Sequence, residues 1–250
     1  MRLGIFSDPH CGHLLGLTPK SYQRGNWRLS HASSKFWDWF VANTKNKKYD
    51  VAAWLADMCE GEGKHDSTFH LTTNIEEQID MAIEIVNTVG AKRNIFVYGT
   101  PYHTSGALDY ESILARHFDE EIKTRYKAEI GGVKFIFRHV LGKTSTPVGG
   151  DIMLRKESLW DIIENPPEER ADWLFFGHVH EFRSVSSVDC TAVAAPALKI
   201  GARDFDKYAR RMSGGFYHVG FIEGEIKKGR FLMEPPIIWP YKVEEGYEKI

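Results

Sequence analysis

Short apolar runs rich in β-branched and aromatic residues recur along the chain and alternate with segments of helical spacing. Runs of four to six apolar residues between turn signals are typical of buried strands, whereas apolar repeats at three and four residues are typical of amphipathic helices. Because such elements bury their apolar faces by stacking in layers, the pattern predicts an α/β or α+β domain around a mixed sheet. The 250 residues contain no recognisable linker or repeat, which favours a single domain over residues 1–250.

The expected elements follow from this periodicity. We expect strands at 3–6, 51–56, 94–98, 126–130, 133–138, 173–176, 188–194, 215–222 and 225–232, the last three antiparallel. We expect helices at 33–43, 75–89, 110–117 and 158–163. Ser33 or Ser34 is expected to cap the first helix, and Gly90 to follow the end of the second. Gly131-Gly132 and Glu223-Gly224 are expected to form hairpin turns.

Charge and cysteine content exclude several classes of protein. The formal net charge of −2 gives no field that would capture nucleic acid non-specifically, so binding to nucleic acid is possible but not indicated. Three cysteines without paired spacing indicate neither a disulfide framework nor a cysteine zinc site and favour a reducing compartment. No segment has the apolar length of a secretory signal or a membrane span, so we expect a cytoplasmic protein without membrane contact. The oligomeric state is left open.

Residues that can bind metal ions follow the ends of five expected strands. They are Asp8 and His10, Asp57, His103, His139, and His178 with His180. In open α/β sheets, the carboxyl ends of strands meet at one edge, where ligands bind, so these side chains are expected to converge. Carboxylates and imidazoles without thiols suit Mn, Fe or Zn. Because a carboxylate can bridge two cations about 3.5–4 Å apart, Asp57 is expected to be the bridge in a two-metal site.

The order and spacing of these residues resemble the calcineurin-like metallophosphoesterase family. The resemblance lies in Asp8-x-His10, Ala56-Asp57, Gly99-Thr100-Pro-Tyr-His103, an isolated His139 and Gly177-His178-Val-His180, and it covers about four-fifths of the chain. It implies a four-layer αββα sandwich with two mixed β-sheets and with the metal site at the strand carboxyl ends. It also implies that two divalent ions activate a bridging hydroxide as the nucleophile.

The resemblance assigns a role to each position. Asp8, His10 and His180 would hold one metal, and His139 and His178 the second, with Asp57 between them. Thr100 stands where the family has an Asn ligand, and we expect it to complete the second site as a weaker ligand. His103 follows Thr100 by three residues instead of one and is expected to be the leaving-group acid, without an evident carboxylate partner.

The function implied is hydrolysis of phosphate esters, and we favour a phosphodiesterase, possibly a nuclease. A phosphomonoesterase or protein phosphatase, and a phosphoesterase-like scaffold that binds protein partners without catalysis, remain alternatives. The segment 203–211 combines basic and aromatic residues that could contact a substrate, although interspersed acids favour a solvated helix. The Gly-rich stretch 142–150 follows His139 and is expected to form a rim of the site.

Overall fold

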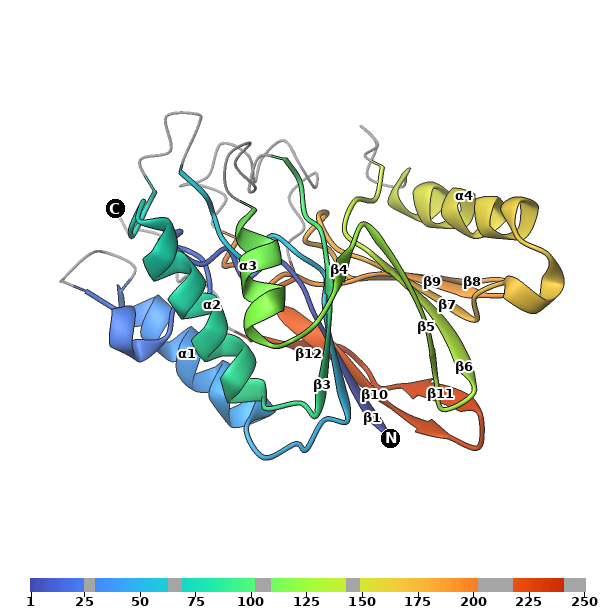
Figure 1. Ribbon diagram of the computed structural model, residues 1–250, viewed down its shortest axis with the longest axis horizontal. Coiled ribbons are helices and arrows are strands. Elements are labelled where there is room, and N and C mark those ends of the chain that lie inside the picture. The colour runs from blue at the N-terminus through green and yellow to red at the C-terminus, as the bar shows by residue number, and fades with distance from the viewer. Residues whose placement is uncertain (25–29, 63–68, 102–108, 143–148, 202–217, 241–250) are drawn as a thin grey trace, which may run out of the picture.

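Two β-sheets lie face to face and carry helices on their outer surfaces (Figure 1). The computed structural model describes residues 1–24, 30–62, 69–101, 109–142, 149–201 and 218–240. Three helices cover the first sheet and one covers the second. The fold is therefore the four-layer αββα sandwich with two mixed sheets, as expected from the sequence.

The first sheet has the strand order β11-β10-β1-β2-β3-β4, and β12 pairs with β10. Strands β1 to β4 run parallel, while β10 is antiparallel to β1 and β11 to β10. The bounds are Arg2–Phe6 (β1), Val51–Trp54 (β2), Arg93–Val97 (β3), Ile122–Lys123 (β4), Gly220–Lys227 (β10), Arg230–Met233 (β11) and Ile237–Ile238 (β12).

The second sheet has the order β5-β6-β7-β9-β8. Its central strands β6, β7 and β9 run parallel, and the edge strands β5 and β8 are antiparallel to their neighbours. The bounds are Arg125–Ile130 (β5), Val133–Arg138 (β6), Trp173–Phe176 (β7), Arg183–Ser186 (β8) and Thr191–Ala194 (β9).

Three apolar layers lie between the helices and the two sheets, because side chains along each strand alternate between its two faces. The helices are α1 (Ser30–Thr44), α2 (Ile75–Val89), α3 (Tyr110–His117) and α4 (Gly149–Glu164), with short 3-10 turns at Lys20–Tyr22 (η1) and Pro167–Glu169 (η2). Along β2, Ala52 and Trp54 face the helices of the first sheet, whereas Val51 and Ala53 face the second sheet. A third apolar layer lies between the second sheet and α4. The parallel strands β1, β2, β3, β6, β7 and β9 are thus largely buried on both faces, which fixes their carboxyl ends in space.

Helix α2 has the bounds expected from its spacing. The side chain of Asn74 accepts hydrogen bonds from the N–H groups of Glu76 and Glu77, and Gly90 ends the helix with φ of 61°. Glycine adopts this left-handed backbone conformation with little free-energy cost. The helix at 110–117 and the strand at 173–176 also have the expected bounds.

The expected turn at Glu223-Gly224 is wrong. Both residues lie inside β10, and the hairpin turn to β11 is at Lys228-Gly229, where both φ angles are positive. Glu223 is buried, and the cost of burying its carboxylate is offset by hydrogen bonds from the Tyr49 hydroxyl at 2.5 Å and the Lys47 ammonium at 2.7 Å. Gly224 is required by packing, since a Cβ there would lie 2.6 Å from the Phe231 ring. The described part of the strand expected at 215–222 continues into that expected at 225–232 as one strand, β10, which is followed by the shorter β11; residues 215–217 lie outside the described residues.

Smaller differences concern element ends. Helix α1 begins at Ser30, so Ser33 is a buried residue within it and neither expected serine caps it. The strand expected at 188–194 begins only at Thr191, because Val188 lies fully exposed in the preceding turn. It pairs in parallel with β7 on one side and antiparallel with β8 on the other, so the antiparallel arrangement expected holds on one side only. Helix α4 extends well before the expected 158–163. None of the described helices has the length and apolar character needed to cross a bilayer.

Candidate metal centre

The loops that carry the candidate ligands leave the carboxyl ends of β1, β2, β6 and β7. Parallel pairing continues from β1 and β2 into their loops, where the backbone N–H of Asp8 donates to Ala56 O and that of His10 donates to Asp57 O. The register also continues, because Leu3 pairs with Val51 and Cys11 with Cys59, both at an offset of 48 residues. The first two ligand motifs are therefore held side by side.

Six residues around these loops adopt left-handed backbone conformations. They are Asp8, His10, Ala56, Asp57, His178 and His180, with φ between 47° and 70°. Such conformations cost non-glycine residues about 1–3 kcal/mol each and persist where the surrounding structure enforces them, often at functional sites. Ala56 has a φ of 66°, a conformation that glycine adopts at less cost than alanine.

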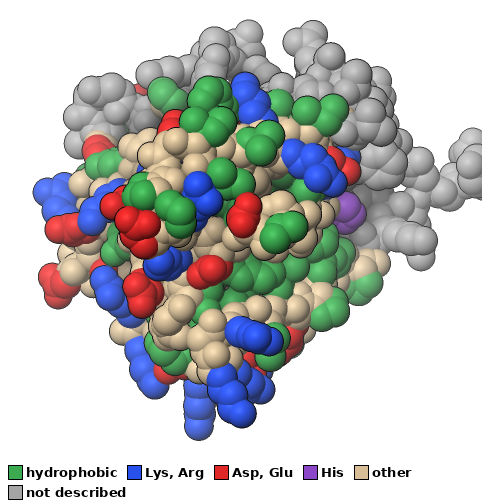
Figure 2. Space-filling view, turned by 90° about the vertical axis from the view of Figure 1, so that its right-hand side faces the viewer, with side chains coloured by type: hydrophobic (Ala, Val, Ile, Leu, Met, Phe, Trp, Pro, Cys, Tyr) green, Lys and Arg blue, Asp and Glu red, His purple; other side chains and the backbone are tan. Residues whose placement is uncertain are grey.

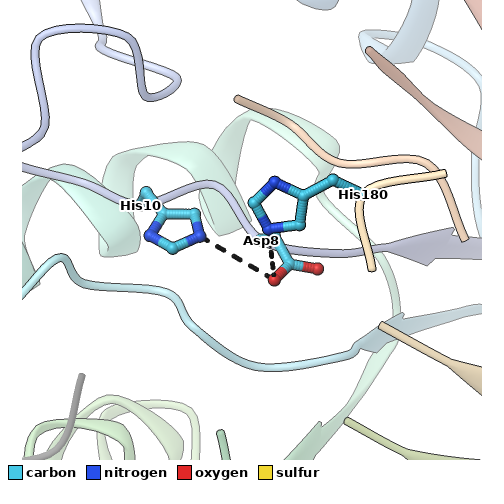
Figure 3. Close-up of side chains that lie close together, drawn as sticks. All are labelled: Asp8, His10 and His180. Carbon is cyan, nitrogen blue, oxygen red and sulfur yellow. Dashed lines mark hydrogen bonds and ion pairs between the residues drawn. The ribbon is translucent and has the colours of Figure 1, made fainter. Parts of the chain in front are cut away.

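Asp8, His10 and His180 form the first group of potential ligands. Figure 3 shows both imidazole rings directed at the same carboxylate oxygen, with His180 Nε2 at 3.1 Å and His10 Nε2 at 3.8 Å from Asp8 Oδ1. All three side chains are buried, and one atom of each lies within 4.8 Å of the others. The second carboxylate oxygen of Asp8 accepts a hydrogen bond from the Ser7 hydroxyl, which fixes the rotamer.

Asp57, His139 and His178 form the second group, again with ligand atoms within 4.8 Å of one another. His139 Nε2 lies 3.0 Å from Asp57 Oδ2. His139 Nδ1 donates to the Leu55 carbonyl at 2.6 Å, so Nε2 is the nitrogen presented to the carboxylate. Two atoms bound to one cation at about 2.1 Å lie about 3.0–3.4 Å apart, so this spacing fits a shared ion.

The two groups adjoin each other. The backbone N–H of His178, from the second group, donates to Asp8 Oδ2 of the first at 3.1 Å. The two groups also interact electrostatically. Burial alone would raise the pKa of Asp8, but the charges of His180 and His139 hold it well below its ordinary value. Burial alone would lower the pKa of His139, but Asp57 and Asp8 raise it to about 10. The carboxylates of Asp8 and Asp57 and the imidazoles of His139 and His180 therefore interact across the two groups.

Thr100 lies against the second group. Its backbone N–H donates to Asp57 Oδ1 at 2.9 Å, and its hydroxyl lies 3.4 Å from the same oxygen. The backbone amide of Thr100 therefore orients the Asp57 carboxylate. The expected leaving-group acid His103, the residues of 203–211 and most of the stretch 142–150 lie outside the described residues.

Two glycines allow the loops to approach the ligands closely. A Cβ on Gly99 would lie 2.2 Å from Asp57 Oδ1 and 2.9 Å from the Asp57 backbone nitrogen. A Cβ on Gly177 would lie 2.3 Å from the Ser7 hydroxyl oxygen and 2.9 Å from His139 Nδ1. Both positions therefore require glycine for steric reasons, in addition to any backbone preference.

Two carboxylates that support the ligands were not expected from the sequence. Glu60 Oε2 lies 2.7 Å from His10 Nδ1 and 3.7 Å from the buried ammonium of Lys199. Burial alone would raise the pKa of Glu60, but Lys199 and His10 lower it well below its ordinary value, so the carboxylate accepts the His10 N–H. The offset of 48 residues between the paired segments after β1 and β2 could have indicated from the sequence that residues 58–60 lie beside His10.

Glu111 is the second missed carboxylate. It projects from α3, and its oxygens accept hydrogen bonds from the N–H of Gly99 at 2.6 Å and of Met58 at 3.5 Å. It thereby ties the loop after β2 to the loop after β3. Burial and the neighbouring Asp57 raise the pKa of Glu111 to about 8. Its place depends on how α3 packs, for which the sequence offers no signal.

Comparisons with known proteins gave structural similarities only. No family model and no curated protein matches the chain. Wild-type Vps29 from Entamoeba histolytica complexed with zinc is 13% identical over 95% of this chain and 99% of that chain, with a TM-score of 0.48. A novel archaeal phosphodiesterase is 12% identical over 96% and 100%, with a TM-score of 0.45. A predicted phosphoesterase from Streptococcus pneumoniae is 13% identical over 96% and 92%, with a TM-score of 0.43.

These scores by themselves say nothing about activity. The strand order, the facing mixed sheets and the two ligand groups at the strand ends are features of this chain itself. In its fold and in the arrangement of its motifs, the chain resembles the calcineurin-like metallophosphoesterases, as its sequence indicated.

Proposed function

We propose that this protein is a dinuclear metal-dependent phosphoesterase that hydrolyses phosphodiesters. The observation that carries the proposal is the pair of adjoining groups Asp8-His10-His180 and Asp57-His139-His178, buried except for the partly buried His178 and joined by the hydrogen bond from His178 N–H to Asp8. Burying two carboxylates together with three imidazoles is costly unless the carboxylate charges are compensated. A pair of divalent cations compensates both at once.

The donor set fits such cations. Oxygen and imidazole ligands without thiols suit Mn, Fe or Zn, and each group offers three ligand atoms. In this proposal Asp57 would hold both ions, and Thr100 would add a weak oxygen ligand to the second. Because carboxylic acids and imidazolium groups must lose a proton before they bind a metal ion, the high pKa of His139 makes metal affinity increase with pH.

The residues of the chain have distinct roles in this scheme. When bound, two divalent cations lower the pKa of water and neutralise charge on the phosphoryl oxygens. The Leu55 carbonyl fixes the ring orientation of His139, and Glu60 fixes that of His10. The Thr100 N–H fixes the orientation of the Asp57 carboxylate. His103 is proposed to protonate the leaving group. The preference for diesters follows from the family resemblance, and the monoesterase reading uses the same ligands.

The test compares two chromogenic substrates. Manganese-loaded protein is assayed with bis(4-nitrophenyl) phosphate and with 4-nitrophenyl phosphate, and we expect faster turnover of the diester. Asp57→Asn is expected to lower the rate and the metal affinity at least about 100-fold, since a ligand contributes no less than the groups that orient it. Asp38→Asn is the matched control, because Asp38 is an exposed residue of α1 that pairs only with Lys20 among the described residues.

Each result discriminates between readings. Turnover of the monoester alone would support a phosphatase in place of the diesterase. Metal-loaded protein that is inactive toward both esters would favour a non-catalytic scaffold. An unchanged rate in Asp57→Asn would contradict the metal centre itself.

A further inference from the structure

The segment that follows β9 lies against the loop of the first ligand group. Strand β9 runs parallel to β7, so both strands end at the edge of the sheet where the ligands lie. The backbone N–H of Leu198 donates to the carbonyl of Ser7 at 2.8 Å. Lys199 then pairs antiparallel with Gly16, and a Cβ on Gly16 would lie only 2.1 Å from the carbonyl oxygen of His10. The backbone therefore holds Lys199 beside the loop that carries His10.

The ammonium group of Lys199 is buried without a hydrogen bond. Its side chain is 10% exposed, and Nζ donates to no atom of the residues that the structure describes. Its ionic contact there is with Glu60 Oε2 at 3.7 Å, beyond hydrogen-bond distance, and that oxygen already lies 2.7 Å from His10 Nδ1. Figure 2 shows surface lysines and arginines interspersed with acidic side chains and open to solvent, which Lys199 is not. A buried ammonium with unused N–H donors indicates that an acceptor is missing.

The charge of Lys199 favours an anion as that acceptor. Burial and then the nearby charge of Lys199 lower the pKa of His13 well below its ordinary value, so this charge acts on the loop after β1. A fixed positive charge repels cations and attracts anions, most strongly where water is excluded. Glu60 compensates this charge only in part, because a buried ion pair needs close contact and hydrogen bonds, which a separation of 3.7 Å does not provide.

We propose that the ammonium group of Lys199 binds the phosphate group of the substrate. This inference rests on the proposed phosphoesterase function, since the adjoining metal centre would bring a phosphate ester to the side of His10. Lysine binds phosphate as a compact positive charge with three N–H donors. Lys199 is then a substrate-binding residue that favours anionic esters, and it is not a metal ligand.

Inorganic phosphate and the chromogenic diester are the probes that test this role. Calorimetry measures phosphate binding to protein saturated with manganese, and steady-state kinetics give the KM for bis(4-nitrophenyl) phosphate. Lys199→Met is expected to weaken phosphate binding and to raise this KM at least about tenfold each, because a hydrogen bond between charged groups is lost. Lys199→Arg keeps the charge and is expected to lie closer to the wild type. Lys47→Met is the matched control, because Lys47 also pairs with a buried carboxylate, that of Glu223, but lies before the amino end of β2. It should leave both quantities unchanged.

Manganese affinity separates this role from a purely supporting one. If Lys199 only held Glu60 in place, Lys199→Met would weaken manganese binding as Glu60→Gln is expected to do. We expect manganese affinity to be equal to that of the wild type or higher, because a positive charge near the cations is removed. Glu60→Gln/Lys199→Met removes both charges and leaves no unpaired buried carboxylate, so it serves if the single variant does not fold. Saturated with manganese, it should bind phosphate at least about tenfold more weakly than Glu60→Gln.

The outcomes distinguish this inference from the proposed function. Phosphate binding as tight in Lys199→Met as in the wild type, or as tight in the double variant as in Glu60→Gln, would overturn the role of Lys199. A loss of manganese affinity in Lys199→Met as large as that in Glu60→Gln would also overturn it. Wild-type protein that binds manganese but neither phosphate nor either ester would refute the proposed function itself, and this inference with it.

Discussion

Gly99→Ala provides a steric test of the metal centre in which no ligand residue is substituted. The new Cβ would lie 2.2 Å from Asp57 Oδ1, which is 1.2 Å short of the 3.4 Å at which ordinary contact begins. It would also lie 2.9 Å from the Asp57 backbone nitrogen and 3.0 Å from Glu111 Oε1, so rotation of one side chain cannot relieve the clash. The Asp57 carboxylate must therefore move by about 1 Å, whereas a functional site needs its groups held within about 0.5 Å.

We expect this displacement to lower metal affinity about 10- to 100-fold and to destabilise the fold by about 1–3 kcal/mol. The matched control is Gly229→Ala. Gly229 has φ of 69° and open space around its Cβ position, so alanine there costs about 1 kcal/mol of backbone strain without touching a ligand. Manganese titration by isothermal calorimetry and unfolding in urea measure both effects. Full manganese affinity in Gly99→Ala would refute the placement of Asp57 as a ligand.

Three further outcomes follow from the supporting residues. Glu60→Gln removes the carboxylate that orients His10, so we expect manganese affinity, measured by competition with a chromophoric chelator, to fall about 10- to 100-fold; unchanged affinity would contradict this role. The pKa of Glu111 is raised from 4.5 to about 8, so the folded state binds the proton more tightly and the metal-free protein should lose on the order of 5 kcal/mol of stability as pH rises through this window. Urea unfolding should show that loss in the wild type and not in Glu111→Gln. Tyr49→Phe removes a donor from buried Glu223 and is expected to cost about 1–3 kcal/mol in urea unfolding, with no change in manganese affinity.

The sequence predicted the sheets well where strands are buried on both faces. The strand at 173–176 is a continuous apolar run and that at 133–138 is mostly apolar, and both form as expected between turn signals. The candidate ligands after the strands converge because parallel strands end at one edge. Local patterns and one topological rule were therefore enough to assemble Asp8, Asp57 and the later histidines.

The features that were missed depend on contacts between distant segments. Glu223-Gly224 looks like a turn, but burial against Tyr49 and Lys47 and the Phe231 ring keep it in a strand. Glu111 reaches the ligand loops only through the packing of α3. Strands β4 and β12 have two residues each, too few to produce a periodic pattern. Tertiary packing determined each of these.

Electron paramagnetic resonance during titration with manganese tests the central claim most directly. Two Mn²⁺ ions about 3.5–4 Å apart interact magnetically, as expected if Asp57 bridges the two ligand groups. We expect two ions per chain and an exchange-coupled spectrum at saturation, and only uncoupled binding in Asp57→Asn. Saturation at one ion per chain, or two ions with the simple six-line signal of isolated Mn²⁺, would contradict the two-metal centre.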